Sequence, residues 1–117
     1  MKENFNAVQQ LAVDAASEKK AFDILILDLR NRSDLTDSFM ICSANSKVQA
    51  QSIVDEILEK YNEVKIKPLG IEGYSGGYWI VVDLGDLIAH VFHKEARHHY
   101  DLERLWGDVP VIKILKE

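Results

Sequence analysis

Two apolar runs separated by only two residues constrain the fold of this chain more than any other stretch of its sequence. Tyr78–Leu84 and Leu87–His93 are both rich in residues that suit strands, and Gly85-Asp86 lies between them. Glycine at the first central position suits a two-residue hairpin turn, because the positive φ needed there strains other residues. The spacing therefore predicts two antiparallel neighbouring strands with a fixed register.

That register sorts the side chains of the hairpin onto two faces, because successive strand residues point to opposite sides. The first face is apolar and is expected to lie under helices: Tyr78, Ile80, Val82, Leu84, Leu87, Ala89 and Val91. The second, mixed face carries Trp79, Val81, Asp83, Ile88, His90 and Phe92. If helices cover only one side of the sheet, the mixed face is exposed to water or to a partner. A three-residue turn would instead split the mixed face.

The segments before the hairpin alternate between helix and strand patterns. Apolar residues at helical spacing predict a first helix that ends near Lys20. Short apolar runs predict strands at Asp23–Leu29 and Ser38–Ser43. A further strand is predicted at Val64–Leu69, and we place it at an edge because Pro68 lacks the donor that a central strand needs.

A capping box precedes the second predicted helix. Ser46 and Gln49 have the spacing at which a hydroxyl and an amide satisfy free amide hydrogens at a helix start. The helix that follows has a regular apolar stripe, formed by Ala50, Ile53, Val54, Ile57, Leu58 and Tyr61.

The C-terminal part is expected to add a short helix and a tail. Leu102, Leu105 and Trp106 fall at helical spacing before Gly107, and the tail runs over Val111–Glu117. A length of 117 residues without repeats or a linker fits one domain over residues 1–117. The expected fold class is α/β, a mixed sheet of about five strands with helices mainly on one face.

Charge and cysteine content exclude several classes of function. With 14 Lys and Arg against 19 Asp and Glu, the net charge is −5, which argues against binding nucleic acid by phosphate neutralisation. The single cysteine, Cys42, excludes an internal disulfide, so we expect a cytoplasmic protein with this cysteine in its core. No apolar run approaches the roughly 20 residues that cross a bilayer, so no membrane partner is expected.

The histidines give little support for a metal site. His90 and His93 point to opposite faces of a strand, and the adjacent His98 and His99 diverge in the same way on a helix. We therefore expect neither a metal nor another cofactor.

Candidate catalytic groups are similarly weak. The Ser43–Ser46 segment could present amide hydrogens to a phosphate, but it lacks the glycines and lysine of a nucleotide loop, which favours helix capping. Asp83 lies beside His90 on the mixed face, yet no nucleophile accompanies them there. Catalysis by these groups is therefore possible but has no further support on that face.

Four runs of residues carry a family resemblance. They are Asp37–Ser43, Gly77–Asp86, His90–Phe92 and Tyr100–Asp108. In this order they resemble the ribosomal silencing factors, also called the Iojap family, over nearly the whole chain, and the last run is the most specific. Ala44 departs from the pattern, since the family has glycine in its Ser-Gly-Asn-Ser motif.

The resemblance implies a translational repressor with a nucleotidyltransferase-like topology. Such factors bind the large ribosomal subunit through ribosomal protein fourteen and sterically block joining of the small subunit, which lowers translation under nutrient limitation. This sequence lacks the Gly-Ser loop and Asp-x-Asp metal pair with which that fold performs catalysis. Neither an enzymatic reaction nor direct sequence-specific binding of nucleic acid is implied.

The mixed face is where the residue pattern and the resemblance agree. Its aromatic and acidic residues would suit a basic ribosomal protein, by apolar burial together with charge attraction. The main candidates for partner binding are Trp79, Asp83 and His90, and the weaker ones are Glu72, Tyr74 and Met40.

Two alternatives stay open at this point. One is a relic nucleotidyltransferase or phosphate-binding domain that uses Ser43–Ser46 with Asp83. The other is an adaptor that pairs with itself, because an exposed apolar sheet face can also form a homodimer when the protein is free.

Overall fold

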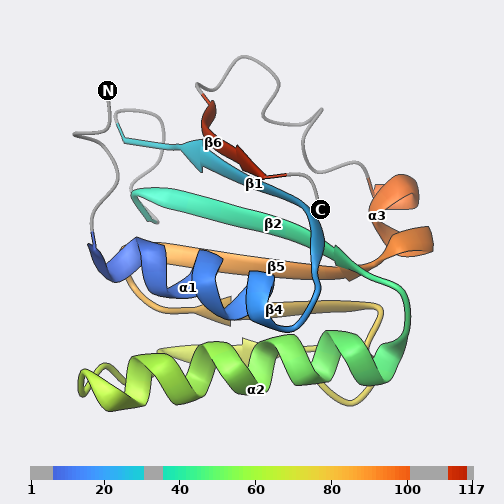
Figure 1. Cartoon of the computed structure of the whole chain (residues 1–117), viewed down its shortest axis with the longest axis horizontal. Coiled ribbons are helices and arrows are strands. Elements are labelled where there is room, and N and C mark those ends of the chain that lie inside the picture. The colour runs from blue at the N-terminus through green and yellow to red at the C-terminus, as the bar shows by residue number, and fades with distance from the viewer. Residues whose placement is uncertain (1–6, 31–35, 101–110, 116–117) are drawn as a thin grey trace.

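Six strands form one mixed sheet in this computed structural model, which describes residues 7–30, 36–100 and 111–115 (Figure 1). The strands are β1 (Phe22–Asp28), β2 (Ser38–Ala44), β3 (Gly70–Glu72), β4 (Trp79–Asp83), β5 (Leu87–His93) and β6 (Val111–Leu115). Their order is β3-β4-β5-β2-β1-β6. The central pair β2 and β5 is parallel, and the other neighbouring pairs are antiparallel. The expected α/β class and mixed sheet are confirmed.

Two helices cover one face of this sheet. They are α1 (Ala7–Glu18) and α2 (Lys47–Glu63), which lie side by side in front of the strands (Figure 1). A third helix, α3 (Lys94–Tyr100), packs from the other side and contributes Ala96 to the apolar cluster there. Helices therefore lie mainly on one face, as predicted. None of the helices within the described ranges is long and apolar enough to span a membrane.

The predicted capping box starts α2. The Ser46 hydroxyl accepts a hydrogen bond from the Gln49 amide N–H at 3.0 Å, and the Gln49 side-chain oxygen accepts one from the Asn45 N–H at 2.7 Å. The Gln49 side-chain amide also donates to the carbonyls of Lys19 and Lys20, at 3.0 Å each. This one side chain therefore joins the start of α2 to the end of α1.

The hairpin forms in the predicted register. Trp79 pairs with Phe92 and Asp83 with Ile88, so Leu84 and Leu87 flank the two-residue turn. Gly85 has φ +91°, the positive value that a turn of this kind requires at its first central residue. The helix-covered face is buried as expected, except that Tyr78 is 54% exposed.

The mixed face is buried more deeply than its sequence predicts. A second apolar cluster lies on this side of the sheet: Leu27, Leu29, Phe39, Ile41, Ile88, Phe92 and Ala96. Phe92 is fully buried and His90 is 6% exposed. The expectation that this face is open to water or a partner is therefore wrong for β5 and holds only for β4.

The strand predicted at Val64–Leu69 is wrong. The Lys65 N–H donates to the Asn62 carbonyl and the Ile66 N–H to the Tyr61 carbonyl, which is a Schellman cap at the end of α2. Lys65 adopts the left-handed conformation of this cap, with φ +62°. The strand begins only at Gly70, after Pro68, and it does lie at the edge of the sheet.

The C-terminal expectations had mixed outcomes. The stretch predicted as a tail contains β6, which pairs antiparallel with β1 and adds a strand to the expected sheet. The helix predicted around Leu102, Leu105 and Trp106 lies outside the described residues.

Candidate functional site

Four side chains from neighbouring strands share one side of the sheet at its β3 edge. Glu72 pairs with Val81 and Gly70 with Asp83, so Glu72 lies on the same face as alternate residues of β4. Glu72 is exposed, and Trp79, Val81 and Asp83 are partly exposed. We call these four residues the edge surface. The structure brings together Trp79, Asp83 and Glu72 from the predicted set.

The Trp79 side chain is held by two contacts, one on the face of its ring and one at its indole N–H. Its ring stacks on that of the fully buried Phe92, with centroids 5.1 Å apart and planes at 24°. Its indole N–H donates a hydrogen bond to His90 Nδ1 at 3.1 Å. A partly exposed aromatic ring that is held in this way can present apolar area to a partner without first having to be ordered.

His90 lies beneath the edge surface rather than within it. Its ring meets Phe39 edge to face, with centroids 4.4 Å apart. Burial lowers the pKa of His90 to about 4, so the imidazole is neutral at neutral pH. Since Nδ1 accepts from Trp79, the proton of the neutral ring resides on Nε2, which has no hydrogen-bond partner in the described structure. The prediction that His90 is a direct partner contact conflicts with this burial.

Asp83 does not pair with His90. Its Oδ1 accepts a hydrogen bond from the Gly85 N–H at 2.9 Å, which supports the hairpin turn. The two side chains, neighbours in the sequence pattern, therefore make separate interactions, Asp83 with the turn and His90 with Trp79.

The depressed pKa of His90 predicts a loss of stability in mild acid. The unfolded chain binds the proton near pH 6.5, whereas the folded chain resists it until about pH 4, so stability falls as the pH drops through this window. We expect His90 to account for a loss on the order of 2 kcal/mol in unfolding free energy between pH 7 and pH 5. Urea denaturation of wild type and His90→Leu at both pH values measures it. Equal pH dependence in the two proteins would contradict the prediction.

Two weaker candidates lie elsewhere. Met40 is fully buried in the cluster under the helices, so it cannot belong to a surface on the opposite face. The Tyr74 hydroxyl donates to Asp55 Oδ1 of α2 at 2.9 Å, and the Tyr74 carbonyl accepts from the Gln51 amide at 2.8 Å. Tyr74 is thus attached to the helix-covered side of the sheet. Strand alternation alone could not assign either residue, because neither is in the predicted hairpin.

The residues of the enzyme alternative are not brought together. Ala44 pairs with His93 at one end of β5, whereas Asp83 pairs with Ile88 at the other, a separation of about 17 Å along the strand. The hydroxyl of Ser43 accepts from the guanidinium of Arg97 at 2.9 Å, and Ser46 is used by the helix cap. Within the described residues, no three His, Cys, Asp or Glu side chains are grouped to hold a metal ion.

Cys42 behaves as predicted. It is fully buried, and burial raises the pKa of its thiol to about 12, which keeps it protonated and unreactive.

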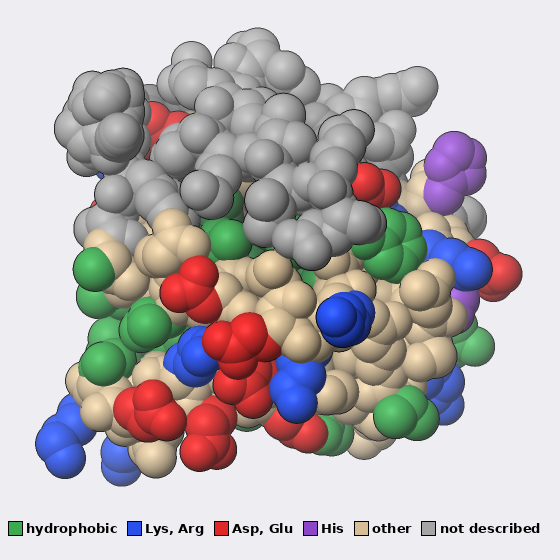
Figure 2. Space-filling model, in the orientation of Figure 1, with side chains coloured by type: hydrophobic (Ala, Val, Ile, Leu, Met, Phe, Trp, Pro, Cys, Tyr) green, Lys and Arg blue, Asp and Glu red, His purple; other side chains and the backbone are tan. Residues whose placement is uncertain are grey.

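The helix-covered side is a mixed-charge surface. Figure 2 shows acidic and basic side chains interspersed over the helices. Lys60 of α2 contacts Glu18 of α1 at 3.0 Å and Glu56 at 3.7 Å. Such partly exposed pairs contribute little to stability and are typical of a solvated face. The edge surface differs, since it has apolar side chains between two carboxylates.

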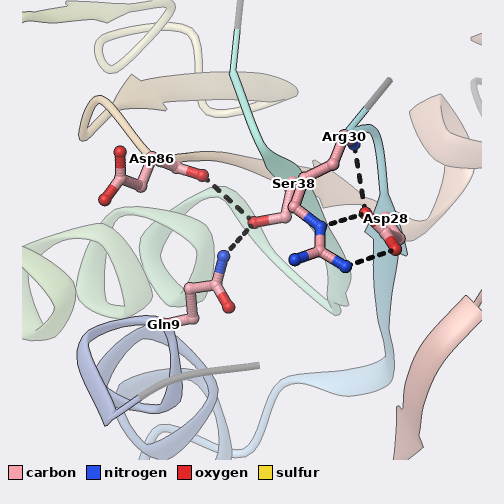
Figure 3. Close-up of polar contacts among 5 residues, drawn as sticks. All are labelled: Gln9, Asp28, Arg30, Ser38 and Asp86. Carbon is pink, nitrogen blue, oxygen red and sulfur yellow. Dashed lines mark hydrogen bonds and ion pairs between the residues drawn. The ribbon is translucent and has the colours of Figure 1, made fainter. Parts of the chain in front are cut away.

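Sequence reasoning missed a buried polar network at the turn end of the sheet (Figure 3). The side-chain amide of Gln9, a residue only 3% exposed, donates to the Ser38 hydroxyl at 2.8 Å, and that hydroxyl donates to the Asp86 carbonyl at 3.2 Å. This network joins α1, β2 and the hairpin turn. The signal was present in the sequence, because Gln9 shares a helical face with the buried Ala12 and Ala16.

A family model, curated proteins and solved structures match this chain over most of its length. A family model described as "Ribosomal silencing factor during starvation" matches residues 2–117. The ribosomal silencing factor of Bacillus subtilis is 43% identical over 108 residues, which cover 92% of each chain. A Mus musculus protein named "Mitochondrial assembly of ribosomal large subunit protein 1" is 28% identical over 99 residues, covering 82% of this chain and 43% of that protein. A crystal structure of a Chromobacterium violaceum protein matches with a TM-score of 0.83 at 31% identity, covering 86% and 83% of the two chains.

Proposed function

Because this chain belongs to the ribosomal silencing factor family, we propose that it represses translation by occupying the large ribosomal subunit. It binds through ribosomal protein fourteen and sterically blocks joining of the small subunit, which lowers translation in the cytoplasm when nutrients are limiting. The mode of action is occlusion, without a chemical reaction. The name of the mouse relative, which refers to the large ribosomal subunit, supports the choice of subunit.

The observation that carries this proposal is the composition of the edge surface. Trp79 supplies a pre-ordered aromatic anchor, and Val81 adds apolar area beside it. Glu72 and Asp83 place carboxylates next to them, on a chain whose net charge is −5. Aromatic residues dominate the binding energy of interfaces, and complementary charge speeds association, so this surface fits a basic protein partner.

Sedimentation with purified subunits tests the proposal. The chain is expected to migrate with large subunits in a sucrose gradient, and to reduce the fraction of joined ribosomes when it is added before small subunits. It should not migrate with small subunits alone. Large subunits depleted of ribosomal protein fourteen should lose the binding. Equal binding to such depleted subunits, or full joining in the presence of bound protein, would refute the proposal.

Two narrower points complete the proposal. We propose that the sheet has a nucleotidyltransferase-like topology, supported by its mixed order and by helices that cover mainly one face.

We also propose that the free protein forms a homodimer through the edge surface, so that self-association and ribosome binding compete. Sedimentation equilibrium of the free protein tests this competition, because added large subunits should then dissociate the dimer.

A further inference from the structure

We propose that His90 is a positioning residue, whose imidazole holds the indole of Trp79 in the orientation that the ribosomal partner meets. His90 itself lies beneath the surface and does not contact the partner. This inference rests on the proposed function and deepens it, because it assigns contact with the partner to Trp79 and the orientation of the Trp79 ring to His90.

The register of the hairpin creates this arrangement. His90 pairs with Val81 and Phe92 pairs with Trp79, so Trp79 and His90 are diagonal neighbours on one face of the sheet. Aromatic side chains reach across such a diagonal. Phe92 supports the face of the indole, and His90 Nδ1 receives its N–H at 3.1 Å. The stack limits the tilt of the ring, and the hydrogen bond fixes its rotation within the stacking plane.

The surroundings of His90 argue against a role in stability alone. The ring is enclosed by aromatic side chains, with Phe39 edge to face at 4.4 Å and Phe92 at 6.4 Å. Its Nε2 is buried, and the described residues offer it no hydrogen-bond partner. An apolar side chain of similar volume would avoid this desolvation penalty. The buried Nε2 of the imidazole therefore lowers the stability of the fold, whereas Nδ1 accepts the hydrogen bond from Trp79.

The hydrogen bond between Trp79 and His90 is expected to increase the affinity for the partner. A partner that meets a mobile indole must immobilise it, which reduces affinity, whereas an indole that is already fixed avoids this loss. His90 therefore acts through Trp79, and removing only its acceptor should weaken binding without unfolding the chain.

A matched pair of variants tests this inference. Leucine and asparagine have the same branched shape, but only His90→Asn keeps an oxygen acceptor near the place of Nδ1. We expect His90→Leu to weaken binding to purified large subunits roughly 5-fold. His90→Asn should stay within about 2-fold of wild type by the same argument. The unfolding temperature of His90→Leu should equal or exceed that of wild type.

The side-chain indole N–H resonance of Trp79 reports on the hydrogen bond to His90. If His90 only stabilised the fold, this resonance would not shift in His90→Leu while keeping its place in His90→Asn. Trp79→Phe identifies the resonance by its disappearance. The Trp79 resonance should shift toward the position of a free indole in His90→Leu and stay near the wild-type position in His90→Asn.

The outcomes separate this inference from the proposed function. A resonance that is identical in all three proteins, or wild-type affinity in His90→Leu despite a shifted resonance, overturns the positioning role alone. Equal losses of affinity in both variants that follow their unfolding temperatures also overturn it. A wild-type chain that fails to bind large subunits overturns the proposed function, and the positioning role with it.

Discussion

Replacing Trp79 by alanine is expected to weaken binding to the large ribosomal subunit at least about 30-fold, or about 2 kcal/mol. The substitution removes the aromatic anchor of the edge surface, including the area that faces a partner. It also removes the stack on Phe92 and the hydrogen bond to His90. Titration of labelled protein with purified large subunits measures the affinity.

The control for Trp79→Ala must separate binding from folding. Because Trp79 packs against the second apolar cluster, the variant should melt at a lower temperature, and binding should be measured well below its midpoint. Val48→Ser is a suitable surface control, since Val48 is 74% exposed on α2, a helix on the opposite face of the sheet from the edge surface. Wild-type affinity in a folded Trp79→Ala protein would exclude the edge surface as the docking site.

Replacing Gly73 by alanine is expected to lower the unfolding free energy by about 3 kcal/mol. Gly73 has φ +81°, which strains any residue with a Cβ. A Cβ at this position would lie 2.2 Å from the carbonyl oxygen of Trp79, so the backbone itself would have to move. Denaturant unfolding measures the loss. Because the displaced backbone is that of Trp79, affinity for large subunits should fall as well.

Two other glycines resolve the cause of this loss. Gly85 has φ +91° but open space within 4 Å of where a Cβ would lie, so Gly85→Ala tests strain alone, worth about 1–2 kcal/mol. Gly70 has neither feature, and Gly70→Ala should change stability by less than about 0.5 kcal/mol. If Gly73→Ala is no more destabilising than Gly85→Ala, the close approach to Trp79 is not a constraint.

The parts of the fold that were predicted correctly are those with a local signal. Gly85-Asp86 determined the hairpin register, and Ser46 with Gln49 determined the start of α2. The errors occurred where the signal was missing or distant. A lysine, Lys65, occupies the left-handed position where a helix end most often has glycine, so no residue type marked a break between α2 and the predicted strand. The strand β6 depends on pairing with β1, which no local pattern indicates.

The candidate site was predicted in outline but not in depth. Alternation along β4 correctly placed Trp79 and Asp83 on one face. Glu72 joins them through the pairing of β3 with β4, which the sequence did not predict. Alternation does not show how deeply each strand is buried. β5 lies between β4 and β2 and is covered on both faces. His90, which was expected to contact the partner, is therefore buried beneath the edge surface.

The pairing of β6 with β1 also has a consequence for the order in which the chain folds. These strands are adjacent in the sheet, but β2 to β5, α2 and α3 all lie between them in the sequence. Closing so long a loop is entropically unfavourable, so this contact should form late. During synthesis, β1 would then remain an open edge strand until β6 has emerged. The newly made chain would be most prone to aggregate in this interval, before β6 is in place.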